Sequence, residues 1–422
     1  MAYQYNINNA KADKRSEKCL FWCHNIFNMT GIFISTFLVA HIYSFAGDVY
    51  DYIFKVCSYY FAEYITMLIF YFLIAKLVEK TNRVSIFRIS LIIRTCLLVL
   101  YVFYGKDIAQ ILLLAGFIKG FSDACYYSSY NVLKQELVSR KSIGKYSANI
   151  YVAAKIIDII CPITLGTLID ISTYSTVAIL ICVICFIQIG VSMFIKSQKP
   201  ENSKLDMRGF FKAIKKDPET YKQLKFIYLI CILYNATIIS AVLNICIMIE
   251  FESSFSLGLI TSVLAIVSVA TIFIVRKFTR PTNRMWLFIA SAIFLTTASL
   301  LLGFFPSKWS VVVYHSAIAV GAIIFKIYFD AYRNGILKEA GLYSEIAEHH
   351  TFMETIFSIV RAFCFLLAIL VALSQKLFLF NAYLILVSML YSAAFICLGI
   401  YERRYIANKP APQTTSSSTP QN

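Results

Sequence analysis

Residues 176–195 read TVAILICVICFIQIGVSMFI, a run of 20 positions without a single charged side chain. A helix needs about 20 apolar residues to cross the hydrocarbon core of a bilayer. Similar runs recur along the 422-residue chain, in which 59% of residues are hydrophobic and only 15% are charged. Soluble domains are about half apolar and about a quarter charged. The sequence therefore predicts an integral membrane protein, and it excludes disorder, a disulfide scaffold and an ordinary soluble enzyme.

Apolar runs bounded by charges predict twelve spans, which must be helices because lipid offers no partner to unpaired backbone groups. The first six are expected at Trp22–Phe45, Ile53–Leu73, Ser85–Phe103, Ile108–Leu133, Ile150–Ile171 and Thr176–Ile195. The second six are expected at Phe226–Met248, Leu257–Val275, Met285–Phe305, Trp309–Ile336, Thr355–Leu373 and Phe378–Ile400. This divides the chain into an N-terminal segment (1–21), a six-helix bundle (22–195), a polar linker (196–225), a second bundle (226–401) and a disordered tail (402–422).

Lys and Arg set the expected orientation. They crowd into the two termini, the linker and every second loop, whereas the alternate loops carry only Lys106, Lys308 and Lys376. By the positive-inside rule, both termini and the linker face the cytoplasm. The same asymmetry accounts for the net charge of +16, so we expect contact with anionic lipid heads and no nucleic-acid partner. The abundance of Ile, Lys, Phe, Tyr and Asn suggests a bacterial plasma membrane, and we expect a monomer.

Three short motifs recur between the two halves. Asn28-Met29-Thr30 returns as Asn235-Ala236-Thr237, and the segment 119–124 (KGFSDA) returns as 326–331 (KIYFDA), both 207 residues later. Thr81-Asn82-Arg83 returns as Thr282-Asn283-Arg284 after 201 residues. Each copy falls in the corresponding element. The sequence thus predicts two parallel six-helix repeats related by an axis along the membrane normal.

At the loop after the second span the chain resembles the major facilitator superfamily, and the resemblance covers residues 20 to 405. The family's loop motif has two glycines, an acid, a base and a final Arg; residues 75–83 (AKLVEKTNR) keep the acid, the base and the Arg, with Ala75 and Asn82 at the glycine positions. The resemblance implies a cytoplasmic gate formed by Glu79, Lys80 and Arg83. The alternative is a basic loop that only sets topology.

A second family signature bears on direction. Exporters that exchange drugs for protons carry Gly-Pro and Gly-Gly in the fifth span, where this chain retains Pro162 and Gly166. Their fourth span carries an Arg four residues before a Gly, but Gly116 occupies that position ahead of Gly120. The resemblance leans slightly to export and departs from the standard drug-exchange mechanism.

Charged residues near the middle of a span cost roughly 2.5–3.5 kcal/mol on insertion scales. Lys119 and Asp123 lie four residues apart on one face of the fourth span, and Lys326 and Asp330 repeat that spacing in the tenth. The resemblance places spans 1, 4, 7 and 10 around a central cavity, so we predict that both pairs form the substrate or coupling-ion site. The alternative is that each Lys merely neutralises its own Asp.

Further side chains are candidates for the same cavity. We predict hydrogen-bonding roles for two amides, an extended cationic surface at an Arg, and stacking on a substrate by two aromatic rings: Asn28, Asn235, Arg333, Tyr126 and Tyr130. The alternatives are helix–helix contacts and interfacial anchoring. Five more charges are expected to pair structurally, with Arg94 needing an acid on another helix: Arg94, Lys155, Asp158, Glu354 and Arg361.

These features predict a secondary active transporter that moves a small molecule by alternating access, coupled to protons, with its direction undetermined. No Walker motif is present, so ATP does not drive the chain directly. No catalytic constellation, metal-ligand spacing or cofactor motif stands out, and we expect no enzyme. The alternative is a flippase for a lipid or lipid-linked precursor on the same fold, which would need an apolar cavity.

Overall fold

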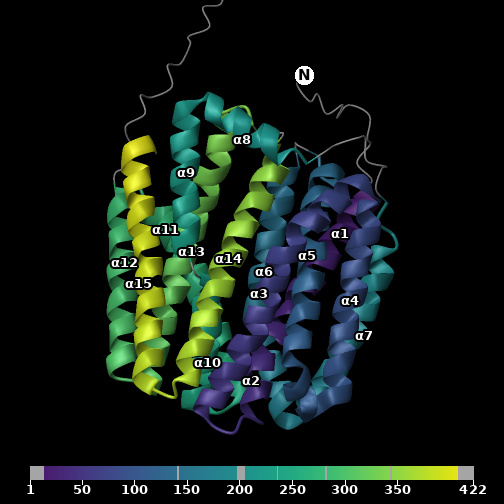
Figure 1. Ribbon diagram of the computed structural model, residues 1–422, viewed down its shortest axis with the longest axis vertical. Coiled ribbons are helices and arrows are strands. Elements are labelled where there is room, and N and C mark those ends of the chain that lie inside the picture. The colour runs from purple at the N-terminus through teal and green to yellow at the C-terminus, as the bar shows by residue number, and fades with distance from the viewer. Residues whose placement is uncertain are drawn as a thin grey trace, which may run out of the picture.

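The computed structural model describes residues 14–139, 142–196, 205–234, 236–280, 283–342 and 345–406. All regular structure in these ranges is helical, and twelve helical segments are long and apolar enough to cross a membrane. They stand roughly side by side in one bundle (Figure 1). The predicted all-helical fold of twelve spans is confirmed.

The first half begins with a span in three parts, in which a π-helical turn at Phe33–Phe37 separates α1 from α2. Polar caps then begin two of the later helices: the side chain of Asp48 accepts from the backbone of Asp51, and Thr173 accepts from Thr176. The helices are α1 (Lys14–Ile32), α2 (Leu38–Tyr43), α3 (Val49–Lys80), α4 (Arg83–Tyr104), α5 (Leu112–Leu137), α6 (Ile143–Ile171) and α7 (Tyr174–Ser192).

The second half is built in the same way, with α9 and α10 together forming the seventh span. Ser253 and Ser307 cap the helices that follow two of its loops. The helices are α9 (Pro218–Leu233), α10 (Ala236–Phe251), α11 (Ser254–Phe278), α12 (Arg284–Phe304), α13 (Lys308–Glu339), α14 (Ile346–Leu373) and α15 (Leu377–Tyr401), which a turn extends to Ile406.

The linker contains a short amphipathic helix, α8 (Met207–Lys216), that the sequence analysis had not anticipated. It buries Phe210 and Ile214 and exposes its basic residues. The ring of Phe211 packs edge-on against the ring of Phe352 on α14, with 4.9 Å between the ring centroids. In Figure 1, α8 lies across the end of the bundle beside α9, and its packing on α9 and α14 fastens this helix to the second half.

Equivalent helices pair in equivalent ways in the two halves. The second span packs on the fourth (α3 with α5), and the eighth packs on the tenth (α11 with α13). The third span packs on the sixth (α4 with α7), and the ninth on the twelfth (α12 with α15). The duplication inferred from short motifs therefore extends to the packing of whole helices.

The halves meet along two seams, α3 with α14 and α6 with α11. The second seam is tight at the end away from the chain termini, where a Cβ on Gly258 would lie 2.3 Å from the carbonyl oxygen of Pro162. The backbone of Ile163 also donates to the Ser262 hydroxyl across this seam. Because only glycine fits at such a distance, helices of the two halves touch backbone to backbone here.

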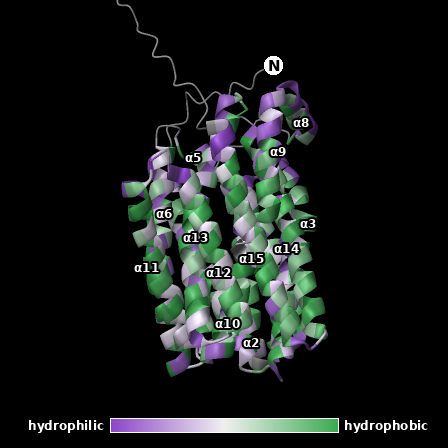
Figure 2. Ribbon diagram, turned by 90° about the vertical axis from the view of Figure 1, so that its left-hand side faces the viewer, coloured by the Kyte–Doolittle hydropathy of each residue, from purple (hydrophilic) through white to green (hydrophobic). Residues whose placement is uncertain are grey.

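Large apolar side chains cover the outside of the bundle. Ile160, Phe186 and Ile266 are each more than half exposed, and hydrophobic residues dominate the shafts of the helices in Figure 2, while hydrophilic residues gather at the end that bears α8. A water-soluble monomer does not expose so much apolar surface. This surface is the one that lipid covers.

Candidate functional site

A cavity of about 600 Å³ lies between the two halves. Its lining mixes charged, amide, hydroxyl and aromatic groups, and a volume of this size suits a small organic molecule. The first half contributes residues of α1, α3, α4, α5 and α6, and the second half contributes α10 and α14. The charged residues that line it are Glu63, Arg94, Lys119, Asp123, Asp158, Glu354 and Arg361.

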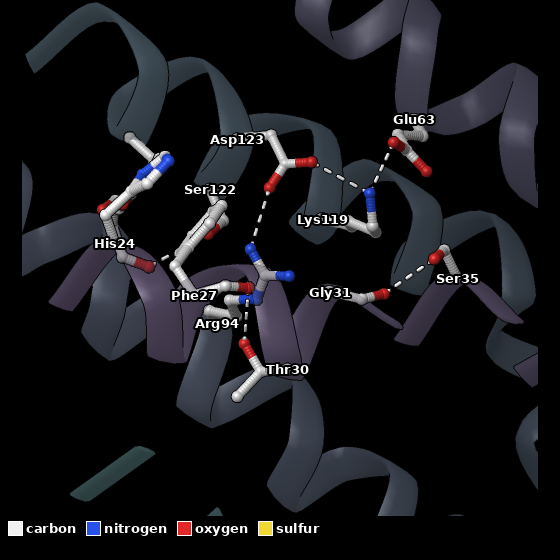
Figure 3. A network of polar contacts seen from close by, with 12 residues as sticks. His24, Phe27, Thr30, Gly31, Ser35, Glu63, Arg94, Lys119, Ser122 and Asp123 are labelled. Atoms are coloured by element: carbon white, nitrogen blue, oxygen red, sulfur yellow. Dashed lines mark hydrogen bonds and ion pairs between the residues drawn. The ribbon is translucent and has the colours of Figure 1, made fainter. Parts of the chain in front are cut away.

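Four of these form one ionic network in the first half, here called the quartet: Glu63, Arg94, Lys119 and Asp123. Lys119 Nζ donates to Glu63 Oε1 at 2.5 Å and to Asp123 Oδ2 at 2.9 Å. Asp123 Oδ1 accepts from Arg94 Nη1 at 3.4 Å. Figure 3 shows the chain of contacts that joins α3, α5 and α4. With two acids and two bases the network is neutral, and each side chain is at most 9% exposed.

Close packing of α3 on α5 makes the quartet possible. Lys119 and Asp123 lie one turn apart, which places both on the same face of α5. The neighbouring Gly120 lets α3 approach, since a Cβ there would lie 2.2 Å from the carbonyl oxygen of Glu63. This approach brings the carboxylate of Glu63 within hydrogen-bond distance of Lys119, although Glu63 lies on another helix, 56 residues earlier in the sequence.

Arg94 is held by an aromatic ring as well as by its acid. Its guanidinium lies 3.6 Å from the centroid of the Phe27 ring, a cation–π contact. A Cβ on Gly31 would lie 3.1 Å from Arg94 Nη2, so the small residue on α1 leaves space for the guanidinium. The sequence analysis predicted that Arg94 needs an acid on another helix, and the structure supplies Asp123.

The opposite wall of the cavity comes from α10 and α14. Arg361 of α14 lies 5.1 Å from the ring centroid of Tyr64 and 5.2 Å from that of Phe357. Neither Arg361 nor Glu354 forms an ion pair or a side-chain hydrogen bond within the described ranges. Helix α10 adds hydroxyl and amide groups to the lining of the same cavity, from Thr237, Ser240 and Asn244.

On α6, Asp158 accepts from Lys155 at 2.8 Å, the local pairing expected from their spacing. Asp158 lines the cavity and its side chain is 39% exposed. Among the described residues, no group of three or more His, Cys, Asp or Glu side chains is placed to hold a metal ion.

Of the predicted substrate residues, Lys119, Asp123 and Asn28 line the cavity. Tyr126 and Tyr130 are buried beside it: Tyr126 stacks on Phe27, and both rings stack on His24. Tyr126 also shares a hydrogen bond of 2.9 Å with His24 Nδ1. Asn235 lies outside the described residues.

The predicted pair in the tenth span is arranged differently from its counterpart in the fourth. Asp330 pairs with Arg333 at 3.2 Å, one turn along α13. Lys326 is exposed and lies 5.8 Å from the ring centroid of Tyr151 on α6. None of these three charged residues is among those that line the cavity. The structure therefore does not bring the two Lys–Asp pairs to one site.

The predicted gate residues lie at the end of the bundle that bears α8. Arg83 pairs with Glu136 of α5 at 3.0 Å, Lys80 is exposed, and Glu79 accepts a hydrogen bond from the Leu205 backbone in the linker. The repeated motif in the second half behaves similarly, because Arg284 pairs with buried Glu402 at 3.1 Å. Glu402 also accepts from Tyr332. This anchorage orders the first residues of the segment that the sequence analysis assigned to the tail.

Two features of the site escaped the sequence analysis. Glu63 was not predicted, since it stands alone in an aromatic stretch with no basic residue one turn away on its own helix. Glu354 and Arg361 were expected to pair structurally, yet the described residues give them no ionic partner. Their spacing of seven residues could have indicated a shared role, because it places both side chains on one face of α14.

The model of the Major Facilitator Superfamily matches residues 20–344. No curated protein matches the sequence. Among solved structures, a bacterial homologue of the iron transporter ferroportin, in an inward-facing state, superposes with a TM-score of 0.65 at 14% identity, over 94% of this chain and 100% of that one. The human organic anion transporter MFSD10 (TETRAN) gives a TM-score of 0.58 at 14% identity, over 92% and 100%. At this identity the likeness concerns the fold.

Proposed function

The chain belongs to the major facilitator superfamily, whose fold serves the membrane transport of small molecules, and on that premise we propose that it is a secondary active transporter driven by protons. Alternating access would expose the cavity between the halves to one side of the membrane and then the other. The substrate binds in this cavity, and the quartet carries the coupled proton.

The observation that supports this proposal is the quartet itself, which combines burial with access to the cavity. Ionised groups inside a membrane protein are costly, and they mark ion pathways and proton relays. Here Lys119 is shared by Glu63 and Asp123, and Glu63 Oε2 has no hydrogen-bond partner among the described residues.

Glu63 is the residue that we assign to proton binding. When Glu63 takes a proton, Lys119 loses one of its two acidic partners and stays with Asp123, which also keeps Arg94. The contact that holds α3 to α5 then weakens. Because α3 also forms the seam with α14, this change acts where the two halves must move relative to each other.

Other parts of the proposal follow from the distribution of charge. Lys and Arg gather at the end with α8 and the termini, so we propose that this end faces the cytoplasm of a bacterial cell. A flippase remains the alternative, but a cavity lined by seven charged side chains suits a soluble polar molecule better than a lipid tail.

The test is transport by purified protein in proteoliposomes with an imposed pH gradient and a trapped pH-sensitive dye. The probes are radiolabelled amino acids, organic acids, organic cations and sugars. We expect one class to be accumulated with proton movement, and the sign of the gradient to give the direction.

Three variants sharpen this test. Glu63→Gln and Asp123→Asn should lose gradient-driven accumulation, whereas Asp330→Asn, which alters an acid outside the cavity, should retain it. Glu63→Gln should still exchange substrate across the membrane without a gradient. Normal coupling in both quartet variants would contradict the proposal, and so would movement of labelled lipid in place of every soluble probe.

A further inference from the structure

The charged groups that line the cavity are ion-paired in the first half, whereas those of the second half are not, among the residues that the structure describes. The quartet is neutral by itself, and Asp158 has Lys155. Once these pairs are set aside, one guanidinium and one carboxylate remain, Arg361 and Glu354. Within the part of the chain that the structure describes, neither has an ion-pair partner.

Both remaining groups lie on the same face of α14. Their separation of seven residues corresponds to about two turns, or roughly 10 Å along the helix axis. Glu354 is nearer the end of the bundle that bears α8, and Arg361 lies deeper. A ligand that entered from the α8 end would meet the carboxylate first and the guanidinium last.

Aromatic rings frame the deeper position. The Arg361 guanidinium lies over the rings of Tyr64 and Phe357. Just beyond it, Phe365 stacks on Tyr60 and Tyr64 at 5.0 and 5.8 Å, which closes the seam between α3 and α14. An anionic group at Arg361 would therefore lie among aromatic rings and accept charge-assisted hydrogen bonds from the guanidinium, which are stronger than neutral ones.

We propose that the cavity binds a zwitterionic small molecule, with its anionic group at Arg361 and its cationic group at Glu354. The inference rests on the transport function proposed above and names its substrate class. A singly charged ligand would pair with one of these groups and leave the other without an ionic partner, so a zwitterion is the better match. The hydroxyl and amide groups of Thr237, Ser240 and Asn244 offer hydrogen bonds to the polar body of such a molecule.

The test measures binding in detergent, so that it is independent of transport. The probes are two matched sets: 6-aminohexanoate with hexanoate and hexylamine, and 4-(aminomethyl)benzoate with 4-methylbenzoate and 4-methylbenzylamine. Each set changes only the charged groups on one carbon skeleton. Thermal shift and calorimetric titration with the native protein should show a zwitterion bound at least about tenfold more tightly than either singly charged relative.

Variants assign the two ends of the ligand. Arg361→Met should weaken zwitterion binding roughly 10- to 100-fold, to the level of the amine, and Glu354→Gln should weaken it to the level of the carboxylate. The exchange Glu354→Arg with Arg361→Glu should restore binding with the ligand reversed. Arg276→Met removes an exposed Arg at the end of α11 and serves as the folding control.

The possible outcomes separate the proposals. Equal affinity for a zwitterion and a singly charged relative, no binding by either set, or unchanged affinity in both α14 variants would overturn the inference. If Arg361 and Glu354 serve only as ion pairs between the halves in another conformation, the variants will change the rate of transport for every substrate and leave the charge preference unaltered. Zwitterion binding without uptake in proteoliposomes would overturn the transport proposal alone.

Discussion

Replacing Lys119 by Met should destabilise the protein far more than the same change at Lys55. The two lysines form ion pairs of equal length, 2.5 Å to Glu63 and 2.5 Å to Asp51. They differ in burial, since the side chains of the first pair are 9% and 3% exposed and those of the second are 22% and 35% exposed. Met has a length similar to that of Lys, so the comparison isolates the charge.

The expected difference follows from what each substitution leaves behind. Without Lys119, Asp123 keeps Arg94, but the buried carboxylate of Glu63 loses the base that pairs with it. Removing one member of a buried pair costs about 3–5 kcal/mol, whereas exposed pairs contribute about 0.2–1 kcal/mol. We therefore expect Lys119→Met to lower the free energy of unfolding by at least ~3 kcal/mol and Lys55→Met by less than ~1 kcal/mol.

A second substitution tests the reason. In the double variant Glu63→Gln with Lys119→Met, both charges are gone and the remaining Asp123–Arg94 pair is neutral. Stability should recover to within about 1–2 kcal/mol of the native protein, because polar and apolar replacements of a whole pair are often tolerated. The free energies would be measured by reversible SDS-induced unfolding in mixed micelles, followed by circular dichroism. Equal losses at Lys119 and Lys55, or no recovery in the double variant, would refute this account of the quartet.

Three further predictions concern packing, the gate and the second half. Gly120→Leu should lower the melting temperature by several degrees, because the new side chain would collide with the backbone of Glu63 on α3, and overpacking costs roughly 1–3 kcal/mol. Gly144→Ala is the control: its Cβ would meet nothing within 4 Å, and Ala favours a helix, so the melting temperature should not fall. Arg83→Gln should break the pair with Glu136 and reduce transport at least about fivefold, while ligand binding in detergent stays within twofold of native; a parallel loss of binding would argue against a gate. Lys326→Met should keep uptake within about twofold of native, since this exposed lysine lies outside the cavity lining. Loss of uptake in this variant would show that Lys326 belongs to the substrate site.

The predicted spans match the helices well because a segment that crosses the hydrocarbon core must be apolar, and hydropathy measures that property. It does not report where a helix ends in water: the expected span 53–73 lies inside α3, which continues from Val49 to Lys80. It also does not report local breaks, such as the π-helical turn at Phe33–Phe37 within an unbroken apolar run. Helix α8 was hidden in a linker whose overall composition is polar.

Site residues were predictable where the interaction is local. Lys119 and Asp123 pair as their spacing indicates, and Lys155 pairs with Asp158. Glu63 could not be predicted, because its contact with Lys119 depends on how closely α3 approaches α5. Repetition in sequence was also an incomplete guide. Lys326 and Asp330 have the same spacing as Lys119 and Asp123, but Asp330 forms its ion pair with Arg333, one turn further along α13.

The two halves have kept one helical framework and placed different chemistry on it. In the first half Lys119 is shared by Glu63 and Asp123, and Glu63 is the acid without a second base in the quartet, which is a state that a proton can change. In the second half α14 holds one group of each sign without an ion-pair partner among the described residues, which is a state that a ligand can complete. The two meet on α3, where neighbouring residues face the two functions: Glu63 contacts Lys119 and Tyr64 lies under Arg361. If a proton on Glu63 shifts α3 relative to α5, the ring beneath the ligand's anionic group moves with it, so proton and substrate are coupled through one turn of one helix.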